Sequence, residues 1–143
     1  MTFQKEIVSE KLNRIDSYLA EVKLSLQIPA KDILNNTEKL RFLERNFQLI
    51  VDEIIDINQY FIKELGLDIS NDLEGTFQVL SDNKILPEDF ALKVAPIVGL
   101  RNRLVHRYEK VEPRIFIESF QKGYSDFEEY IKLIISYSEK EKL

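Results

Sequence analysis

The sequence has 143 residues, no cysteine and a single histidine. Without cysteine no disulfide can form, so nothing in the chain requires an oxidising compartment, and we expect the protein in the cytoplasm. The same scarcity argues against zinc, because zinc sites take most of their ligands from cysteine sulfur and histidine nitrogen. We therefore expect no structural or catalytic metal and no cofactor.

Long hydrophobic runs are missing as well. The apolar stretches fall far short of the roughly 20 residues that a membrane-spanning helix needs. Residues 1–5 are not followed by the apolar segment of a secretory signal. We expect no membrane association. A hydrophobic content of 44% over 143 residues instead predicts one compact domain covering residues 1–143.

The charge is acidic overall and uneven along the chain. A net charge of -5 argues against a protein that coats nucleic acid, because that mode of binding needs a broad basic surface. Residues 101–114 nevertheless hold five cations and two acids. This basic segment in an acidic chain fits a small phosphate-bearing target. A solvated helix end, where the helix dipole favours cations, explains the same charges equally well.

Apolar residues recur at steps of three and four through most of the chain, which is the period of an amphipathic α-helix. The spacing predicts helices over residues 8–26, 37–65, 72–80 and 87–98, and a last helix that begins at residue 113. No segment shows the sustained two-residue alternation of a strand. The predicted fold class is therefore all-α, an antiparallel bundle of about five helices.

Several residues mark where these helices should begin, end or bend. Asn36 or Thr37 can cap the second helix and Gly66 can end it, while Asp72 can cap the short third helix. Pro96 removes a backbone donor and crowds the preceding turn. We therefore expect a kinked or broken helix shortly before residue 101.

The most informative segment is residues 101–108, which read Arg-Asn-Arg-Leu-Val-His-Arg-Tyr and contain the single histidine. An unperturbed imidazole changes its charge near pH 7, so it can accept and return a proton, and a guanidinium can hold a phosphate with two hydrogen bonds. On one straight helix Arg101 and His106 would point about 140° apart. A two-fold dimer would remove this difficulty by bringing a second copy of each group into one cleft.

The spacing of Arg101 and His106, with Asn102 directly after the arginine and Tyr108 two residues after the histidine, resembles the signature of HEPN-domain ribonuclease toxins of the HepT family. The resemblance covers nearly the whole chain. It implies the HEPN fold, a homodimer with the nuclease site at its interface, and metal-independent cleavage of RNA. In that case the chain is the toxin of a type VII-like toxin-antitoxin system.

The resemblance also implies roles for single residues. His106 is the predicted general base on a ribose 2'-hydroxyl or general acid on the leaving oxygen, and Arg101 the group that neutralises the phosphate in the transition state. Asn102 is expected to orient His106 or to bind phosphate. Arg103 and Arg107 are expected to position the RNA backbone. Transfer RNA and messenger RNA both fit as substrates.

Tyr108 has two interpretations. A tyrosine near a helix end usually packs its ring and leaves its hydroxyl in water, which needs no function. In the HepT family, a partner antitoxin of the minimal nucleotidyltransferase type (MntA-like) attaches AMP to the tyrosine at this position. The resemblance therefore predicts AMPylation of Tyr108 as the step that silences the ribonuclease.

Residues of the second helix carry two further hypotheses. Asp56 could pair with an arginine of the motif helix, although a solvated acid is the commoner case for such a position. Phe42, Phe47 and Phe61 have helical core spacing, so all three are expected to pack inside the bundle.

Two other functions stay open at this stage. The HEPN fold also occurs as a noncatalytic companion that binds a nucleotide or substrate for a nucleotidyltransferase. A plain dimerising helical scaffold is the third alternative. RNA cleavage in the presence of a chelator separates the first function from the other two, and nucleotide binding measured by calorimetry separates the second from the third.

Overall fold

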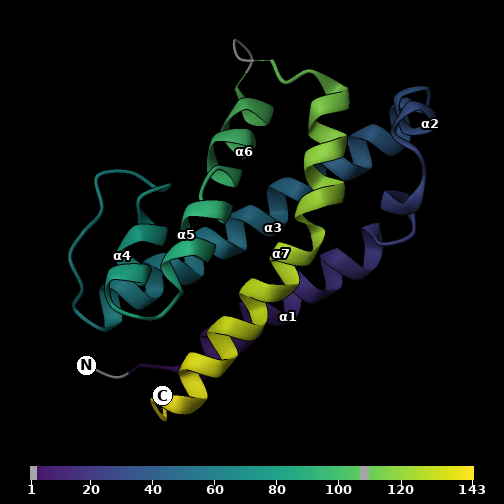
Figure 1. Ribbon diagram of the computed structural model, residues 1–143. Coiled ribbons are helices and arrows are strands. Elements are labelled where there is room, and N and C mark those ends of the chain that lie inside the picture. The colour runs from purple at the N-terminus through teal and green to yellow at the C-terminus, as the bar shows by residue number, and fades with distance from the viewer. Residues whose placement is uncertain (1–2, 107–109) are drawn as a thin grey trace.

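The computed structural model describes residues 3–106 and 110–143. Within these ranges the regular secondary structure is entirely helical, which confirms the predicted all-α class (Figure 1). In chain order the elements are α1 (Lys5–Val22), the 3-10 turn η1 (Ser25–Gln27), α2 (Ala30–Leu34), α3 (Thr37–Glu64), α4 (Thr76–Asp82), α5 (Glu88–Val94), α6 (Ile97–Val105) and α7 (Pro113–Lys140).

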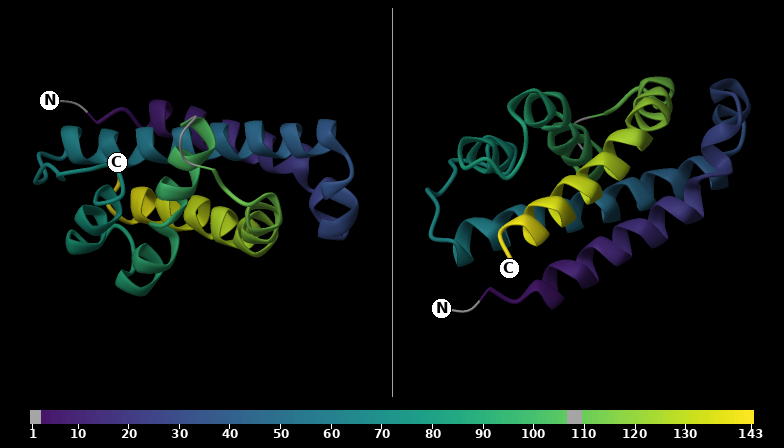
Figure 2. Two further views of the ribbon diagram at one scale, coloured as in Figure 1. Left: turned by 90° about the horizontal axis from the view of Figure 1, so that it is seen from above. Right: turned by 60° about the horizontal axis from the view of Figure 1, so that its bottom comes forward.

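Three long helices form the body of the protein. α1 and α3 run antiparallel side by side, and the surface ion pairs Lys11 to Asp56 and Arg14 to Glu53 join them. α7 crosses in front of both in the view of Figure 1. The shorter α4, α5 and α6 follow one another along one side of this body, and α4 and α6 both contact α3 (Figure 2). No helix in the described part of the chain combines the length and the apolarity that crossing a bilayer requires.

Aromatic side chains join α3 to α7 in the core. The ring of Phe47 packs edge-on against Phe116 and Phe120, with ring centroids 5.4 and 5.2 Å apart. Such contacts favour the edge-to-face geometry because the ring edge is positive and the face negative. Phe47 and Phe61 are buried as predicted, but Phe42 is 39% exposed, so the prediction that it packs inside the bundle is wrong.

The predicted helix ends are partly confirmed. The Asn36 side chain accepts a hydrogen bond from the Lys39 backbone N–H at 3.0 Å, which caps α3. Gly66 has a φ of 64° just beyond α3, a conformation that glycine adopts without a Cβ clash. Asp72 accepts from the Gly75 N–H at 2.7 Å, but it does so in the turn that precedes α4, so the predicted start of this helix is several residues too early.

The segment after α1 differs from the prediction. α1 ends at Val22, and Leu26 reaches the core from the 3-10 turn instead of from a continuous α-helix. A 3-10 turn repeats every three residues, so spacing alone does not distinguish it from an α-helix. α2 was not predicted because its five residues are too few to show a period.

A break precedes the motif, as predicted. α5 ends at Val94 and α6 begins at Ile97, with Pro96 between them. The predicted helix over residues 87–98 is therefore two helices that meet at the proline. This break lets α6 take its own direction across α3.

A buried polar cluster ties α3, α4 and α7 together. The Tyr130 hydroxyl donates to Asn58 Oδ1 at 2.6 Å, and Asn58 Nδ2 donates to the Thr76 hydroxyl oxygen at 3.1 Å. The Thr76 hydroxyl donates to the Leu73 carbonyl at 2.6 Å. All three side chains are buried, and burial raises the pKa of the Tyr130 phenol well above its ordinary value. The phenol therefore stays protonated and acts as a donor.

Candidate functional site

The Arg101 side chain is held by contacts with two other side chains. It lies on α6, where its Nε donates to Oδ1 of Asp52 on α3 at 2.9 Å. Its Nη2 lies 2.8 Å from the same oxygen in an ion pair. The Arg101 side chain is 23% exposed. The carboxylate thus fixes the plane of the guanidinium while the charged group still reaches the surface.

The acid that pairs with Arg101 is not the one suggested by the sequence. Asp56 pairs instead with Lys11 of α1 at 3.3 Å, and its side chain is half exposed. Asp52 and Asp56 are four residues apart and lie on the same side of α3. From the helical period alone, either acid could therefore pair with an arginine of another helix. The packing position of α6 along α3 selects Asp52.

Asn102 contacts Arg101 and not the histidine side chain. Its Oδ1 accepts a hydrogen bond from Arg101 Nη1 at 3.1 Å. Its backbone carbonyl accepts from the His106 N–H at 3.1 Å. The expectation that Asn102 orients the His106 imidazole has no support in this geometry. Its side chain instead helps Asp52 to hold the guanidinium.

His106 leaves the helix. α6 ends at Val105, and His106 follows with extended backbone at φ -89° and ψ 126°. Its side chain is exposed. His106 is the C-cap of α6: its N–H still donates to the Asn102 carbonyl, and the chain leaves the helical path after it. The direction of its side chain relative to Arg101, and the dimer argued from that direction, stay predictions.

The remaining motif residues divide into two groups. Arg103 is exposed on α6, and Val105, on another face of the helix, is 38% exposed. The predictions for Arg107 and Tyr108 lie outside the described residues.

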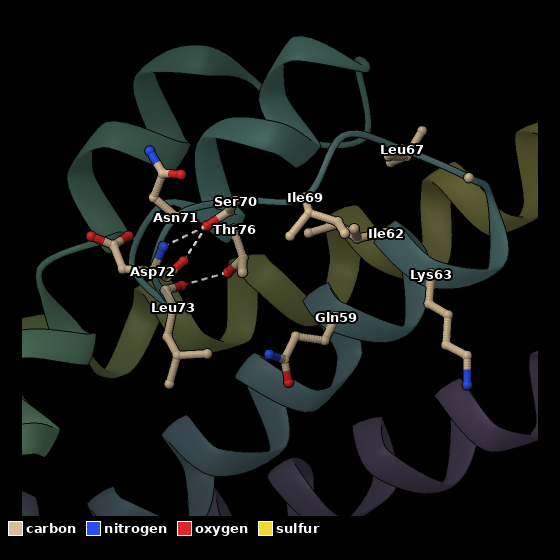
Figure 3. A pocket seen from close by; sticks show the side chains of 11 residues that line it. Gln59, Ile62, Lys63, Leu67, Ile69, Ser70, Asn71, Asp72, Leu73 and Thr76 are labelled. Atoms are coloured by element: carbon tan, nitrogen blue, oxygen red, sulfur yellow. Dashed lines mark hydrogen bonds between the residues drawn. The ribbon is translucent and has the colours of Figure 1, made fainter.

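Among the described residues of the motif, Arg103, Val105 and His106 are exposed and Arg101 and Asn102 are half-buried. A pocket of about 700 Å³ lies elsewhere, between the C-terminal end of α3 and the connector to α4, where Gln59, Lys63, Ile69 and Asp72 are among its lining residues (Figure 3). None of five pockets formed by the described residues is lined by α6 or His106.

An all-helical domain with this motif at the end of α6 has the layout of a HEPN domain. A solved structure of the tri-AMPylated Shewanella oneidensis HEPN toxin in complex with MNT antitoxin aligns with a TM-score of 0.83. The alignment covers 91% of this chain and 97% of that chain at 22% sequence identity. At this identity the likeness establishes the fold.

Sequence comparison is more specific. The family model described as ribonuclease HepT-like matches residues 9–134. The chain belongs to the HepT-like ribonuclease family. Among curated relatives, the tRNA nuclease HepT of Aphanizomenon flos-aquae is 32% identical over 131 residues, covering 92% of this chain and 89% of that protein. The mRNA nuclease HepT of Shewanella oneidensis is 28% identical over 89 residues, covering 62% of this chain and 67% of that protein.

Proposed function

We propose that this chain is the toxin of a toxin-antitoxin pair and that it cleaves RNA without a metal ion. The observation that carries the proposal is the Arg101 guanidinium, which Asp52 and Asn102 hold on the helix that ends at the exposed His106, in a member of the HepT-like family. The relatives named as tRNA and mRNA nucleases support RNA as the substrate. We expect the protein to act in the cytoplasm, where these RNAs are found.

Arg101 is suited to bind the reacting phosphate. A guanidinium has five N–H donors. Nε donates to Asp52 and Nη1 to Asn102, while Nη2 forms an ion pair with the same Asp52 oxygen. Within the described residues, one N–H on each terminal nitrogen is left for a ligand. Two parallel donors match two oxygens of a phosphodiester. Because Asp52 and Asn102 hold the group before RNA arrives, little reorganisation is needed as charge develops in the transition state.

His106 supplies the proton transfer. Its imidazole is exposed where α6 ends, so it can approach the ribose beside the phosphate that Arg101 binds. It removes the proton of the 2'-hydroxyl, and the 2'-oxygen attacks phosphorus while the bond to the 5'-oxygen breaks. The products are a 2',3'-cyclic phosphate and a 5'-hydroxyl. RNA supplies the nucleophile and Arg101 the positive charge, so the mechanism needs no metal.

A homodimer completes this site. One chain has one histidine, whereas the reaction needs a base at the 2'-oxygen and an acid at the 5'-oxygen. A second copy related by a two-fold axis supplies the second imidazole and a facing wall for the open surface around Arg101. Val105, an exposed apolar residue of the motif, is available for contact with that copy.

Regulation is proposed to act at Tyr108. A partner nucleotidyltransferase antitoxin would join the phenolic oxygen to the α-phosphorus of ATP and release pyrophosphate. The added AMP places a negative phosphodiester two residues after His106, where it would repel RNA or occupy Arg101. The AMPylated state of the Shewanella toxin, in complex with MNT antitoxin, supports this part of the proposal.

The decisive experiment is RNA cleavage in the presence of EDTA. Purified protein should cut cellular RNA and leave cyclic phosphate or 3'-phosphate ends. His106→Ala should lower the rate about a hundredfold or more, the effect expected for losing a general acid or base. A His106→Ala protein that cuts at the wild-type rate would overturn the mechanism. Nucleotide binding without any cleavage would favour the noncatalytic companion instead.

A further inference from the structure

The outer face of α3 continues from the site toward the N-terminal end of this helix. At about 100° per residue, Arg41, Arg45 and Asp52 lie within roughly 40° of one another around the α3 axis. Both arginines are exposed. Because Asp52 is the residue that meets Arg101, the two arginines stand on the face of α3 that leads away from the proposed phosphate site.

The spacing along this face suits a nucleic-acid strand. With a rise of 1.5 Å per residue, Arg45 lies about 10 Å from Asp52 along the axis, and Arg41 about 6 Å further. Extended arginine side chains therefore span the interval between successive phosphates of a strand that starts at Arg101. Figure 2 shows, in the view from above, the N-terminal half of α3 running past the motif end of α6.

The two arginines on this face form no ion pairs within the described part of the chain. Glu44 lies near Arg41: burial raises the pKa of its carboxyl, and the Arg41 charge opposes this rise. Arg41 is thus partly balanced by an acid, and Arg45 contributes the freer charge.

Phe42 stands next to these arginines. It is 39% exposed, although a residue of its size and character usually lies in the core. An exposed aromatic ring among cations is the combination by which proteins bind single strands, because bases stack on the ring while cations contact phosphates. Duplex RNA offers no unstacked base, so the ring favours a single-stranded target.

On the C-terminal side of Asp52, the same face of α3 carries different charges. Asp56 is paired with Lys11 of α1, and the next exposed cation in this register is Lys63, near the end of α3. Two exposed arginines thus follow Asp52 within 11 residues on its N-terminal side, whereas on its C-terminal side the first exposed cation of this register is Lys63, also 11 residues away and preceded by the acid Asp56. A strand bound at Arg101 meets favourable charge when it runs toward the N-terminal end of α3.

We propose that Arg41, Phe42 and Arg45, the α3 RNA face, bind the single-stranded segment that flanks the cleaved phosphate. This inference rests on the proposed ribonuclease function and adds a binding surface to it. The two arginines hold backbone phosphates, and Phe42 stacks on one base. The face accounts for how a chain of acidic net charge holds RNA, since the attraction is confined to one strip.

Binding to a fluorescein-labelled oligouridylate tests the proposal in a His106→Ala background, which prevents cleavage. Arg41→Gln and Arg45→Gln should each weaken binding and each reduce the slope of log affinity against log salt by about 0.7, the value for one phosphate contact with a single strand. Phe42→Leu should weaken binding about fivefold or more, while Phe42→Tyr, which keeps the ring, should retain it. Lys63→Gln is the matched control on the same face and should bind normally.

The outcomes separate this inference from the function on which it rests. If wild-type protein cuts RNA but both glutamine variants keep the wild-type affinity and salt slope, the α3 RNA face is overturned and the ribonuclease stands. If wild-type protein neither binds nor cuts RNA, both proposals fall. If the glutamine variants lose only binding to an antitoxin, the face belongs to a protein partner and the RNA assignment is overturned.

Discussion

Two polar clusters join α3 to its neighbours, and they differ in almost every physical respect. The cluster of Asn58, Thr76 and Tyr130 is neutral and buried, and each side chain has a hydrogen-bond partner. The cluster of Arg101 and Asp52 is charged and partly exposed. In the first, the donors and acceptors are consumed within the protein. In the second, two arginine donors are left free by the described residues.

This difference separates structure from function. A buried polar group costs free energy unless it is hydrogen-bonded, so the inner cluster fixes how α4 and α7 sit on α3. An exposed ion pair contributes little to stability, commonly 0 to about 1 kcal/mol, because water screens it. The contacts between Arg101 and Asp52 are therefore better explained by the orientation they give to the guanidinium than by the stability they add.

The sharpest test of this comparison is Arg101→Ala. It should lower the rate of RNA cleavage about a hundredfold or more, because the charge that meets the phosphate is lost. The melting temperature should change little, because the side chain is partly exposed. Cleavage kinetics and a thermal melt on the same preparation distinguish a loss of catalysis from a loss of stability. A large fall in melting temperature with normal cleavage by the folded fraction would show that Arg101 has a structural role and not a catalytic one.

The inner cluster should show the opposite behaviour. Asn58→Ala removes the link between the hydroxyls of Tyr130 and Thr76, so it leaves both without this partner and opens a small cavity. We expect a loss of about 2 to 4 kcal/mol in the free energy of unfolding. Urea denaturation measures it. The cleavage rate per folded molecule should be unchanged. A loss of turnover without a loss of stability would contradict a purely structural role for the buried cluster.

Tyr130→Phe is a milder test of the same cluster. It leaves Asn58 Oδ1 without its donor and should cost about 1 to 3 kcal/mol. The raised pKa of Tyr130 also predicts a pH effect. The unfolded phenol ionises first, so the wild-type contribution is present below its ordinary pKa and is lost as the pH rises past it. Melts across the alkaline range should therefore fall more steeply for wild type than for Tyr130→Phe; parallel curves would exclude this linkage.

The smallest expected effect is at Asp52. Asp52→Asn keeps the shape but removes the charge that orients Arg101, so kcat should fall roughly tenfold, with less than about 1 kcal/mol lost from stability. Asp52→Glu should recover part of the rate if orientation is the role. Asp56→Asn is the control, because Asp56 pairs with Lys11 and not with the motif. Equal effects at both acids would contradict a specific role for Asp52.

Local features of the sequence were sufficient to predict several parts of the molecule. Helical period predicted the all-α class, and side-chain chemistry predicted the cap at Asn36, the end at Gly66 and the break at Pro96. These features depend on a few neighbouring residues, so they can be read without knowing the fold. The motif was found for the same reason, since its spacing and its single histidine are visible along the chain.

Only the tertiary structure decided the features that depend on which helices meet. Asp52 and Asp56 are equivalent by period, and the position of α6 on α3 gives Arg101 to Asp52. Phe42 lies at the border of the apolar stripe, and it is exposed because the helices packed on α3 leave that border partly uncovered. His106 has extended backbone because α6 ends one residue before it, at the start of the connection to α7. Period fixes the face of a helix that a side chain occupies, but burial and pairing depend on what packs against that face.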